Sequence, residues 1–286
     1  MLGIALAIIS AIFMAAMQIF LKKSYKELNP SVAYFFDMLF GVAIWIPVGF
    51  LFGATIEQVW KCLPYAIISA IFSEALVFYA LSKGNLSVAS VLTATYPVYT
   101  LIFSVILNNE ILSVLQVILI LITIIGTVLT AFDNDFKVKN LKNVTIIIPI
   151  ITAIAIGLSD TLTKGIIDET SSFNFLVSIA IVQIPVAIIY LIISKQKPKL
   201  IIKELKDGVK EYKYSIIGSL LNVLGTGCLL ISFNYTYAAI ASPLTAIYTP
   251  FVLIYSVVFL KEKINKINLV GVILAIVGAI GITIIG

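Results

Sequence analysis

Two stretches of this sequence repeat one another and decide the fold. Residues 87–97 read SVASVLTATYP, and residues 239–250 read AIASPLTAIYTP. At an offset of 152 residues, Ala-Ser falls on Ala-Ser, Leu-Thr-Ala falls on Leu-Thr-Ala, and Tyr96 falls on Tyr248. Apolar residues often coincide by chance in a hydrophobic chain, whereas serine, threonine and tyrosine do not. The match therefore predicts that the chain contains two copies of one unit.

The repeat extends well beyond these stretches. The offset of 152 holds toward the end of each half, and an offset of 142 holds near the start, because the connection 195–213 is longer than its counterpart. The equivalent pairs are Gln18 and Asp160, Lys22 and Lys164, Glu110 and Glu262, and Gly126 and Gly278. We expect residues 1–132 and 144–286 to form the two repeats.

Composition places both repeats in a membrane. The chain has 286 residues, of which 61% are hydrophobic and 12% are charged, against about 25% charged residues in a soluble domain. A bilayer core needs roughly 20 apolar residues per helix, and ten such runs are present. The predicted fold is an all-α integral membrane protein with transmembrane helices near 2–21, 31–53, 62–82, 85–107, 113–132, 144–165, 173–194, 214–234, 237–260 and 266–286.

Each half has an odd number of helices, so the second half enters the membrane from the opposite side. This is an inverted repeat, an architecture of many secondary transporters, in which the halves alternate access to a central site. All 19 basic residues are lysines, and all but Lys61 and Lys164 fall in odd-numbered connections. The positive-inside rule therefore predicts a multi-pass protein of the cell (cytoplasmic) membrane, with the odd connections in the cytoplasm and both termini outside.

Three carboxylates lie inside apolar runs, where ionisable residues are costly and usually functional. Asp37 and Asp160 are expected on opposite sides of the membrane midplane, with Glu74 between them in depth. This order suggests a ladder for a cation or a proton, and Glu74 is the leading proton-coupling candidate, ahead of Asp160 and Asp37. Two structural alternatives remain open: Asp160 could pair with Lys164 one helical turn away, and Asp37 could face a wet vestibule.

Other polar residues extend the candidate site. Tyr96 and Tyr248 precede prolines, which interrupt helical hydrogen bonding, and are expected to line a pocket and gate it. Polar amides could bind substrate or hold helices together. The candidate substrate-binding residues are Gln18, Asp37, Glu74, Tyr96, Asp160, Gln183, Asn222 and Tyr248. Glu110 and Glu262, at helix ends, are expected to have packing or interfacial roles.

Enzymatic function is not supported. The chain has no histidine, no H-E-x-x-H and no G-x-S-x-G, and a paired-aspartate hydrolase would need two carboxylates at similar depth. Cys62 and Cys228 show neither metal-ligand nor disulfide spacing and are interpreted as packing residues. We expect no cofactor, no metal and no nucleic-acid partner. A channel would not need an inverted repeat.

The sequence resembles the drug/metabolite transporter superfamily, specifically its ten-helix EamA-type members. The two stretches quoted above carry the resemblance, together with a glutamate after the fourth and ninth helices and a glycine in the last helix of each half. The resemblance implies transport of amino acids, sugars, nucleotide sugars, choline-like cations or drugs. Two features depart from it: many relatives place both termini in the cytoplasm, and the family often has an arginine in the second helix, near the position of Asp37.

The polarity of the predicted site suggests a substrate class. The helices contain acids and almost no bases, which favours a proton-coupled carrier of a small amine-bearing solute, such as an amino acid, polyamine or quaternary amine. The alternative is a carrier of a neutral metabolite or sugar in which the acids are structural. The expected partners are this small molecule, a proton gradient and the lipid bilayer, with the protein acting as a monomer or homodimer.

Overall fold

The computed structural model describes residues 1–82, 93, 95–130, 143–197, 201, 210–255 and 265–285, and this part of the chain contains helices and no strands. Eight helical segments are long and apolar enough to cross a membrane. Two shorter apolar helices, Tyr96–Leu107 and Val114–Thr130, complete ten crossings. The predicted all-helical class with ten spans is therefore confirmed.

The ten crossings divide into two sets of five. The first set is α1 (Leu2–Ser24), α2 (Pro30–Leu51), α3 (Ile56–Ile68) continued by η1 (Ser69–Ala75) and α4 (Leu76–Ser82), α6 (Tyr96–Leu107) and α7 (Val114–Thr130). The second set is α8 (Asn143–Glu169), α9 (Ser172–Ile193), α11 (Lys210–Ser232), α12 (Ala238–Ala246) with α13 (Tyr248–Tyr255), and α14 (Lys266–Ile285).

Two of the helix boundaries that differ from the sequence prediction affect the placement of lysines. The third crossing begins at Ile56 instead of near residue 62, and the sixth continues to Glu169 instead of ending near residue 165. Both extensions are polar turns, such as the one in which Lys61 pairs with Glu57, so a search for apolar runs does not include them. The lysine count had assumed that Lys61 and Lys164 lie in connections. Both lie inside helices instead.

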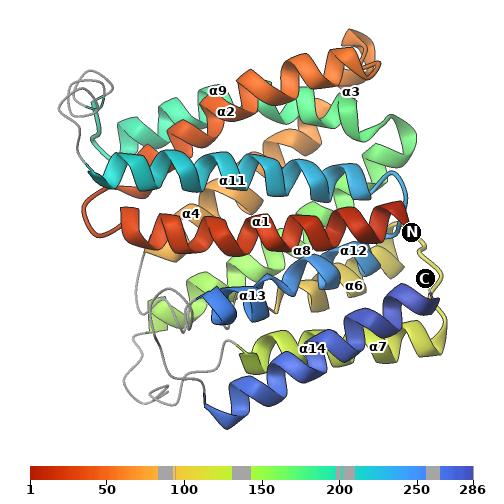
Figure 1. The fold of residues 1–286 in the computed structure, drawn as a ribbon. Coiled ribbons are helices and arrows are strands. Elements are labelled where there is room, and N and C mark those ends of the chain that lie inside the picture. The colour runs from red at the N-terminus through yellow and green to blue at the C-terminus, as the bar shows by residue number, and fades with distance from the viewer. Residues whose placement is uncertain are drawn as a thin grey trace.

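The two ends of the helical bundle carry different connections (Figure 1). One end carries the connections 52–55, 108–113, 170–171 and 233–237, together with both chain ends, and we call it the even-loop end. The other is the odd-loop end. Helix α1 begins at the even-loop end, whereas its counterpart α8 ends there. The equivalent helices of the two halves therefore run in opposite directions, which is the inverted arrangement.

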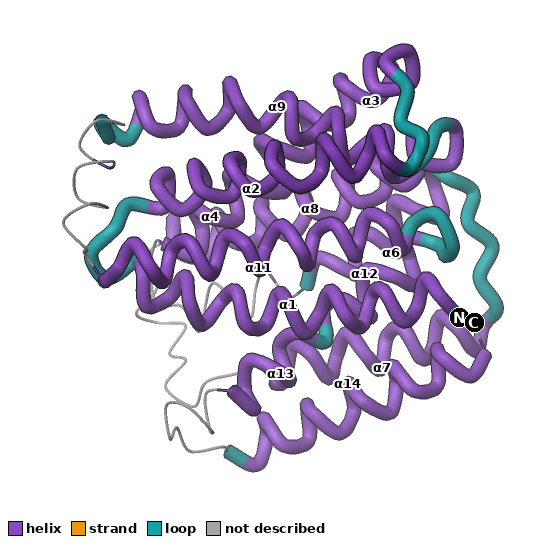
Figure 2. The backbone as a smooth tube through the Cα atoms, turned by 45° about the horizontal axis from the view of Figure 1, so that its top comes forward, coloured by secondary structure: helices purple, strands orange, loops and turns teal. Residues whose placement is uncertain are grey.

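The packing is the same when the halves are exchanged. Helices α2 and α9, the second of each half, pack together at one side of the bundle, and α7 and α14, the fifth of each half, pack at the opposite side (Figures 1 and 2). Between them, α1 packs on α11, α12 and α13, and α8 correspondingly packs on η1, α3 and α6. The centre of the bundle is thus built equally from both halves.

The glycines at the α7–α14 crossing also occupy equivalent positions in the two halves. A Cβ atom on Gly126 would lie 2.2 Å from the backbone nitrogen of Ala275, and one on Gly278 would lie 2.7 Å from the backbone nitrogen of Thr123. Ala275 follows Thr123 by the same repeat offset of 152 residues that relates the two glycines. The crossing is so close that no side chain fits at either glycine position.

Candidate functional site

Helix breaks mark the centre of the bundle. Helix α12 ends at Ala246 and α13 begins at Tyr248, while in the first half α6 begins at Tyr96 with Pro97 in its first turn. Tyr96 and Tyr248 are both buried. Discontinuous helices at mid-membrane are where transporters build binding sites, because the breaks leave polar backbone groups facing a cavity.

A cavity of about 110 Å³ lies beside these breaks. This is room for about four water molecules, and hence for a small solute. Six of the eight predicted site residues line it: Gln18, Glu74, Tyr96, Asp160, Asn222 and Tyr248. Hydroxyl side chains and the methionines Met14 and Met17 supply much of the remaining wall, and the lining residues in the described part of the chain include no lysine.

Two equivalent clusters face each other across the cavity. In one, the Tyr96 hydroxyl donates to the Ser242 carbonyl (3.0 Å), and the Ser242 hydroxyl donates to Asp160 Oδ2 (2.7 Å). In the other, Gln18 hydrogen-bonds the Tyr248 hydroxyl. The repeat relates Gln18 to Asp160 and Tyr248 to Tyr96, so one structural position is neutral in the first half and acidic in the second.

Asp160 does not pair with Lys164, the alternative that the sequence left open. Lys164 instead forms an ion pair with Asp168, one turn further along α8. Asp160 is 7% exposed, and its described hydrogen bond is the one from Ser242. Its carboxylate therefore lies in the cavity wall without a basic partner in the described part of the chain.

The other two acids lie close together, joined by Gln183 of α9. Gln183 Nε2 lies 2.6 Å from Glu74 Oε2 and 3.3 Å from Asp37 Oδ2, and Asn222 Nδ2 donates to Asp37 Oδ1 at 3.0 Å. Asp37 is fully buried and does not line the cavity, whereas Glu74 does. Asp37 and Glu74 thus form a pair, and the predicted order of the three acids in depth stays a prediction.

Glu74 occupies an irregular stretch of its helix. The segment Ser69–Ala75 is π-helical, a wide turn that is rare in proteins and is frequently found at functional sites. Glu74 is 6% exposed, and its Oε1 atom has no hydrogen-bond partner. The Tyr34 hydroxyl also lies against the Glu74 carboxyl, but it donates its single proton to the Ala70 carbonyl at 3.0 Å. The cavity wall therefore presents a buried carboxylate oxygen that is not paired.

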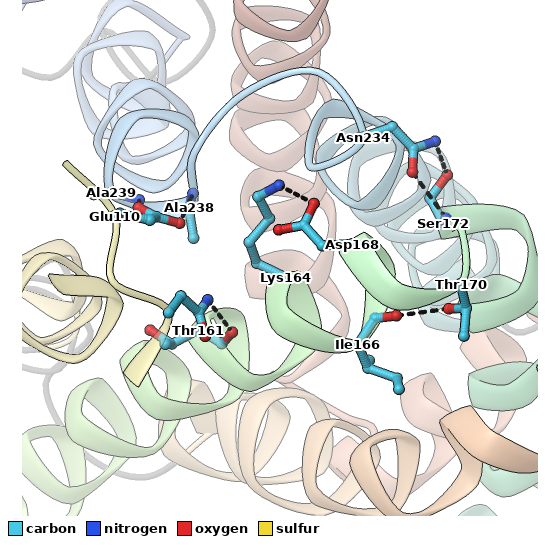
Figure 3. A network of polar contacts seen from close by, with 11 residues as sticks. Glu110, Thr161, Lys164, Ile166, Asp168, Thr170, Ser172, Asn234, Ala238 and Ala239 are labelled. Carbon is cyan, nitrogen blue, oxygen red and sulfur yellow. Dashed lines mark hydrogen bonds and ion pairs between the residues drawn. The ribbon is translucent and has the colours of Figure 1, made fainter. Parts of the chain in front are cut away.

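Polar contacts join the two halves at the even-loop end (Figure 3). Glu110, in the connection after α6, accepts hydrogen bonds from the backbone amides of Ala238 (2.9 Å) and Ala239 (3.0 Å), at the start of α12. Asn108 Nδ2 donates to the Thr161 carbonyl at 2.8 Å. Burial raises the pKa of Glu110 above its usual value, although the two amides oppose this shift. The expected packing role of Glu110 is therefore the capping of a helix in the other half, and Glu262 lies outside the described residues.

Several residues of the site were missed by sequence reasoning. Thr93 and Thr245 both line the cavity and are equivalent in the repeat, so the quoted stretches contained a signal that was used only for the fold. Ser242 belongs to the same stretches. Tyr34 and Gly41, which contact Glu74 and Gln183, carry no comparable pattern, because their roles depend on how α2 packs against η1 and α9.

Comparisons with known proteins agree with this architecture. The EamA-like transporter family model matches residues 1–132 and 143–284. The uncharacterized protein MJ1333.1 of Methanocaldococcus jannaschii is 30% identical over 118 residues, which cover 40% of this chain and 86% of that protein. A protein of known crystal structure superposes with a TM-score of 0.79 over 99% of both chains at 14% identity, and so shares the fold.

The family model covers nearly the whole chain in two matches, one in each half, and the ten helices place both halves in a lipid bilayer. The chain belongs to the EamA-like transporter family and is a multi-pass membrane transporter of small molecules.

Proposed function

We propose that this transporter carries a small amine-bearing cation or zwitterion, such as an amino acid, a polyamine or a quaternary amine, in exchange for protons. The observation that carries the proposal is Glu74 Oε1, a buried acceptor in the cavity wall without a hydrogen-bond partner. Burying a carboxylate without compensation costs several kcal/mol. A proton in one state and a substrate ammonium group in another would each remove that cost.

The rest of the cavity wall supports the same substrate class. Asp160 adds a second carboxylate, and among the described residues no lysine lines the cavity to neutralise either acid. Tyr96 and Tyr248 provide aromatic faces, which attract cations. The amides Gln18 and Asn222 have acceptor oxygens for further donor groups of a bound solute.

The two halves, taken as residues 1–132 and 144–286, would alternate around this cavity. Cross-half contacts made by Asn108 and Glu110 support a closed even-loop end in this conformation. At the odd-loop end there is a vestibule of about 840 Å³. With the lysine distribution, this favours a protein of the cell membrane that faces the cytoplasm in this conformation.

Thermal stability of the purified protein tests the substrate class. A ligand at 100 times its Kd stabilises the folded state by about 2.7 kcal/mol. We expect stabilisation by n-butylammonium and no comparable stabilisation by n-butanol, which has a similar shape and no charge. Glu74→Gln should remove the effect. Glu57→Gln is the matched control, because Glu57 is an exposed carboxylate on α3.

A neutral substrate remains the second candidate, favoured by the existing hydrogen bonds to Asp160 and to Glu74 Oε2. If butanol and butylammonium stabilise the protein equally, and Glu74→Gln responds like the wild type, the acids are structural and the neutral-metabolite carrier replaces the amine carrier.

A further inference from the structure

Asp37 and Glu74 are bound to one donor group. The Gln183 side chain reaches from α9 between α2 and η1, and its Nε2 atom is within hydrogen-bonding distance of a carboxylate oxygen on each side, at 3.3 Å and 2.6 Å. Asp37 and Gln183 are fully buried. The arrangement holds the two carboxyl groups on either side of one amide nitrogen.

The carboxylates of Asp37 and Glu74 determine which way the Gln183 amide points. The amide oxygen faces α2 at Gly41, where a Cβ atom would lie 2.6 Å from it. Amide orientations are assigned from their hydrogen-bonding surroundings, and here the assignment has a physical basis. A reversed amide would place three acceptor atoms together and remove the donor that the two carboxylates share.

No cation neutralises the pair among the described residues. Helix α2 packs on α4, α9 and α11, and η1 packs on α3, α4, α8 and α9. The titratable groups beside the pair are the tyrosines Tyr25 and Tyr34, and Tyr190 with Tyr79 lies behind them. The acid that shares the cavity wall with Glu74 is Asp160. The lysine on α8, Lys164, is bound to Asp168 near the even-loop end.

Two negative charges at this separation repel strongly, because the buried setting provides little screening. We propose that Asp37 and Glu74 form one proton-binding unit, which holds a single shared proton while the cavity is empty, with Gln183 as the residue that positions both carboxyl groups. The proposal rests on the proposed function and specifies its coupling site. Glu74 is the member that meets the substrate, and Asp37 is the member that is shielded from it.

The shared proton would leave by a path that is separate from the substrate cavity. The hydroxyls of Tyr25 and Tyr190 are buried without hydrogen-bond partners, and Tyr25 lies near Asp37. Both tyrosines line the vestibule at the odd-loop end. When an ammonium group binds Glu74 Oε1, the unit becomes doubly ionised, and its proton leaves from Asp37 past these hydroxyls to water in the vestibule. One bound cation therefore releases one proton.

Infrared spectroscopy of the full-length protein tests this unit through the C=O stretch of protonated carboxyl groups, followed as a function of pH. In Asp37→Asn, Glu74 loses the repulsion of its neighbour, so the midpoint of its band should move to lower pH by about one unit or more. In Glu74→Gln, the midpoint of the Asp37 band should likewise move to lower pH. Glu57→Gln, the matched control at an exposed carboxylate, should leave the midpoints of the pair unchanged.

Separate variants test whether Gln183 positions the two carboxyl groups. Gly41→Ala displaces the Gln183 amide and should move the midpoints of the pair, and Gln183→Leu should move them further. Gln183→Glu changes the charge at the same position and should not restore the wild-type profile. Titration of Glu74 that is identical in the wild type and in Asp37→Asn would overturn the pair. If Glu74→Gln nevertheless abolished stabilisation by n-butylammonium, the proposed function would stand without the shared-proton pair.

Discussion

Gln18 and Asp160 occupy equivalent positions in the two halves, and each lies beside the equivalent tyrosine of the opposite half. Gln18 hydrogen-bonds Tyr248, and Asp160 is linked to Tyr96 through Ser242. The site thus has two-fold geometry with a charge on one side only. A bound solute with one cationic and one polar end would match this difference.

The asymmetry leads to a binding prediction. Asp160→Asn keeps an oxygen that can accept the Ser242 hydroxyl, so the protein should fold, but it removes a negative charge from the cavity. We expect the affinity for n-butylammonium, measured by calorimetry, to fall about tenfold or more, equivalent to about 1.4 kcal/mol. Glu57→Gln should bind like the wild type. Unchanged affinity in Asp160→Asn would show that this carboxylate is structural.

The α7–α14 crossing makes a stability prediction. Gly126→Val and Gly278→Val each place a side chain against backbone atoms of the facing helix, at distances that only glycine permits. Overpacking costs typically 1–3 kcal/mol, so both variants should show a lower unfolding temperature, and by similar amounts because the two sites are equivalent.

Gly165→Ala provides the control for these glycine variants. The nearest atom to its new Cβ would be the Asn108 side-chain oxygen, at 3.1 Å, and that side chain can move. A loss of stability in Gly165→Ala as large as that in Gly126→Val would show that the effect is a general cost of replacing helical glycine and does not report the crossing.

Glu110 makes a pH-dependent stability prediction. Glu110→Ala removes the cap of α12 and should cost about 1 kcal/mol. Burial raises the pKa of Glu110 in the folded protein above its unfolded value, so the folded state retains this proton to higher pH. The stabilising contribution of that proton is complete below about pH 4 and is lost as pH rises through the folded pKa.

The comparison with Glu110→Gln isolates this titration, because glutamine keeps one of the two acceptor oxygens and does not ionise. The unfolding temperature of the wild type should decrease relative to Glu110→Gln as pH rises from about 4. The opposite trend would mean that the amides of Ala238 and Ala239 outweigh burial. Glu27→Gln, an exposed change at the opposite end of the bundle, should show no such trend.

Membrane orientation is a further prediction. A reporter fused after Gly286 should be outside the cell, and one inserted within residues 195–213 should be cytoplasmic, because the lysines concentrate in the odd connections. Both positions can be tested with paired reporters that are active on only one side. A cytoplasmic reporter after Gly286 would reverse the orientation, and with it the side that this conformation faces.

Sequence patterns predicted the fold well because the bilayer imposes them. Apolar length defines each crossing, and the matches at Tyr96, Tyr248, Gly126 and Gly278 indicate two halves. Within the site, the same reasoning selected Glu74 as an acid without an obvious partner. It did not identify its contacts, since the bond from Gln183 to Glu74 joins residues 109 positions apart. It also missed the π-helical turn, which depends on tertiary packing and not on local propensity.

The central claim is that Glu74 exchanges a proton for a cationic substrate. Its most direct test is transport of radiolabelled amine in proteoliposomes, with and without a pH gradient, for the wild type and Glu74→Gln. We expect the gradient to drive uptake by the wild type only, while Glu74→Gln stays folded and loses its response to the gradient. Equal dependence on the gradient in both proteins would contradict the claim and exclude Glu74 as the coupling residue.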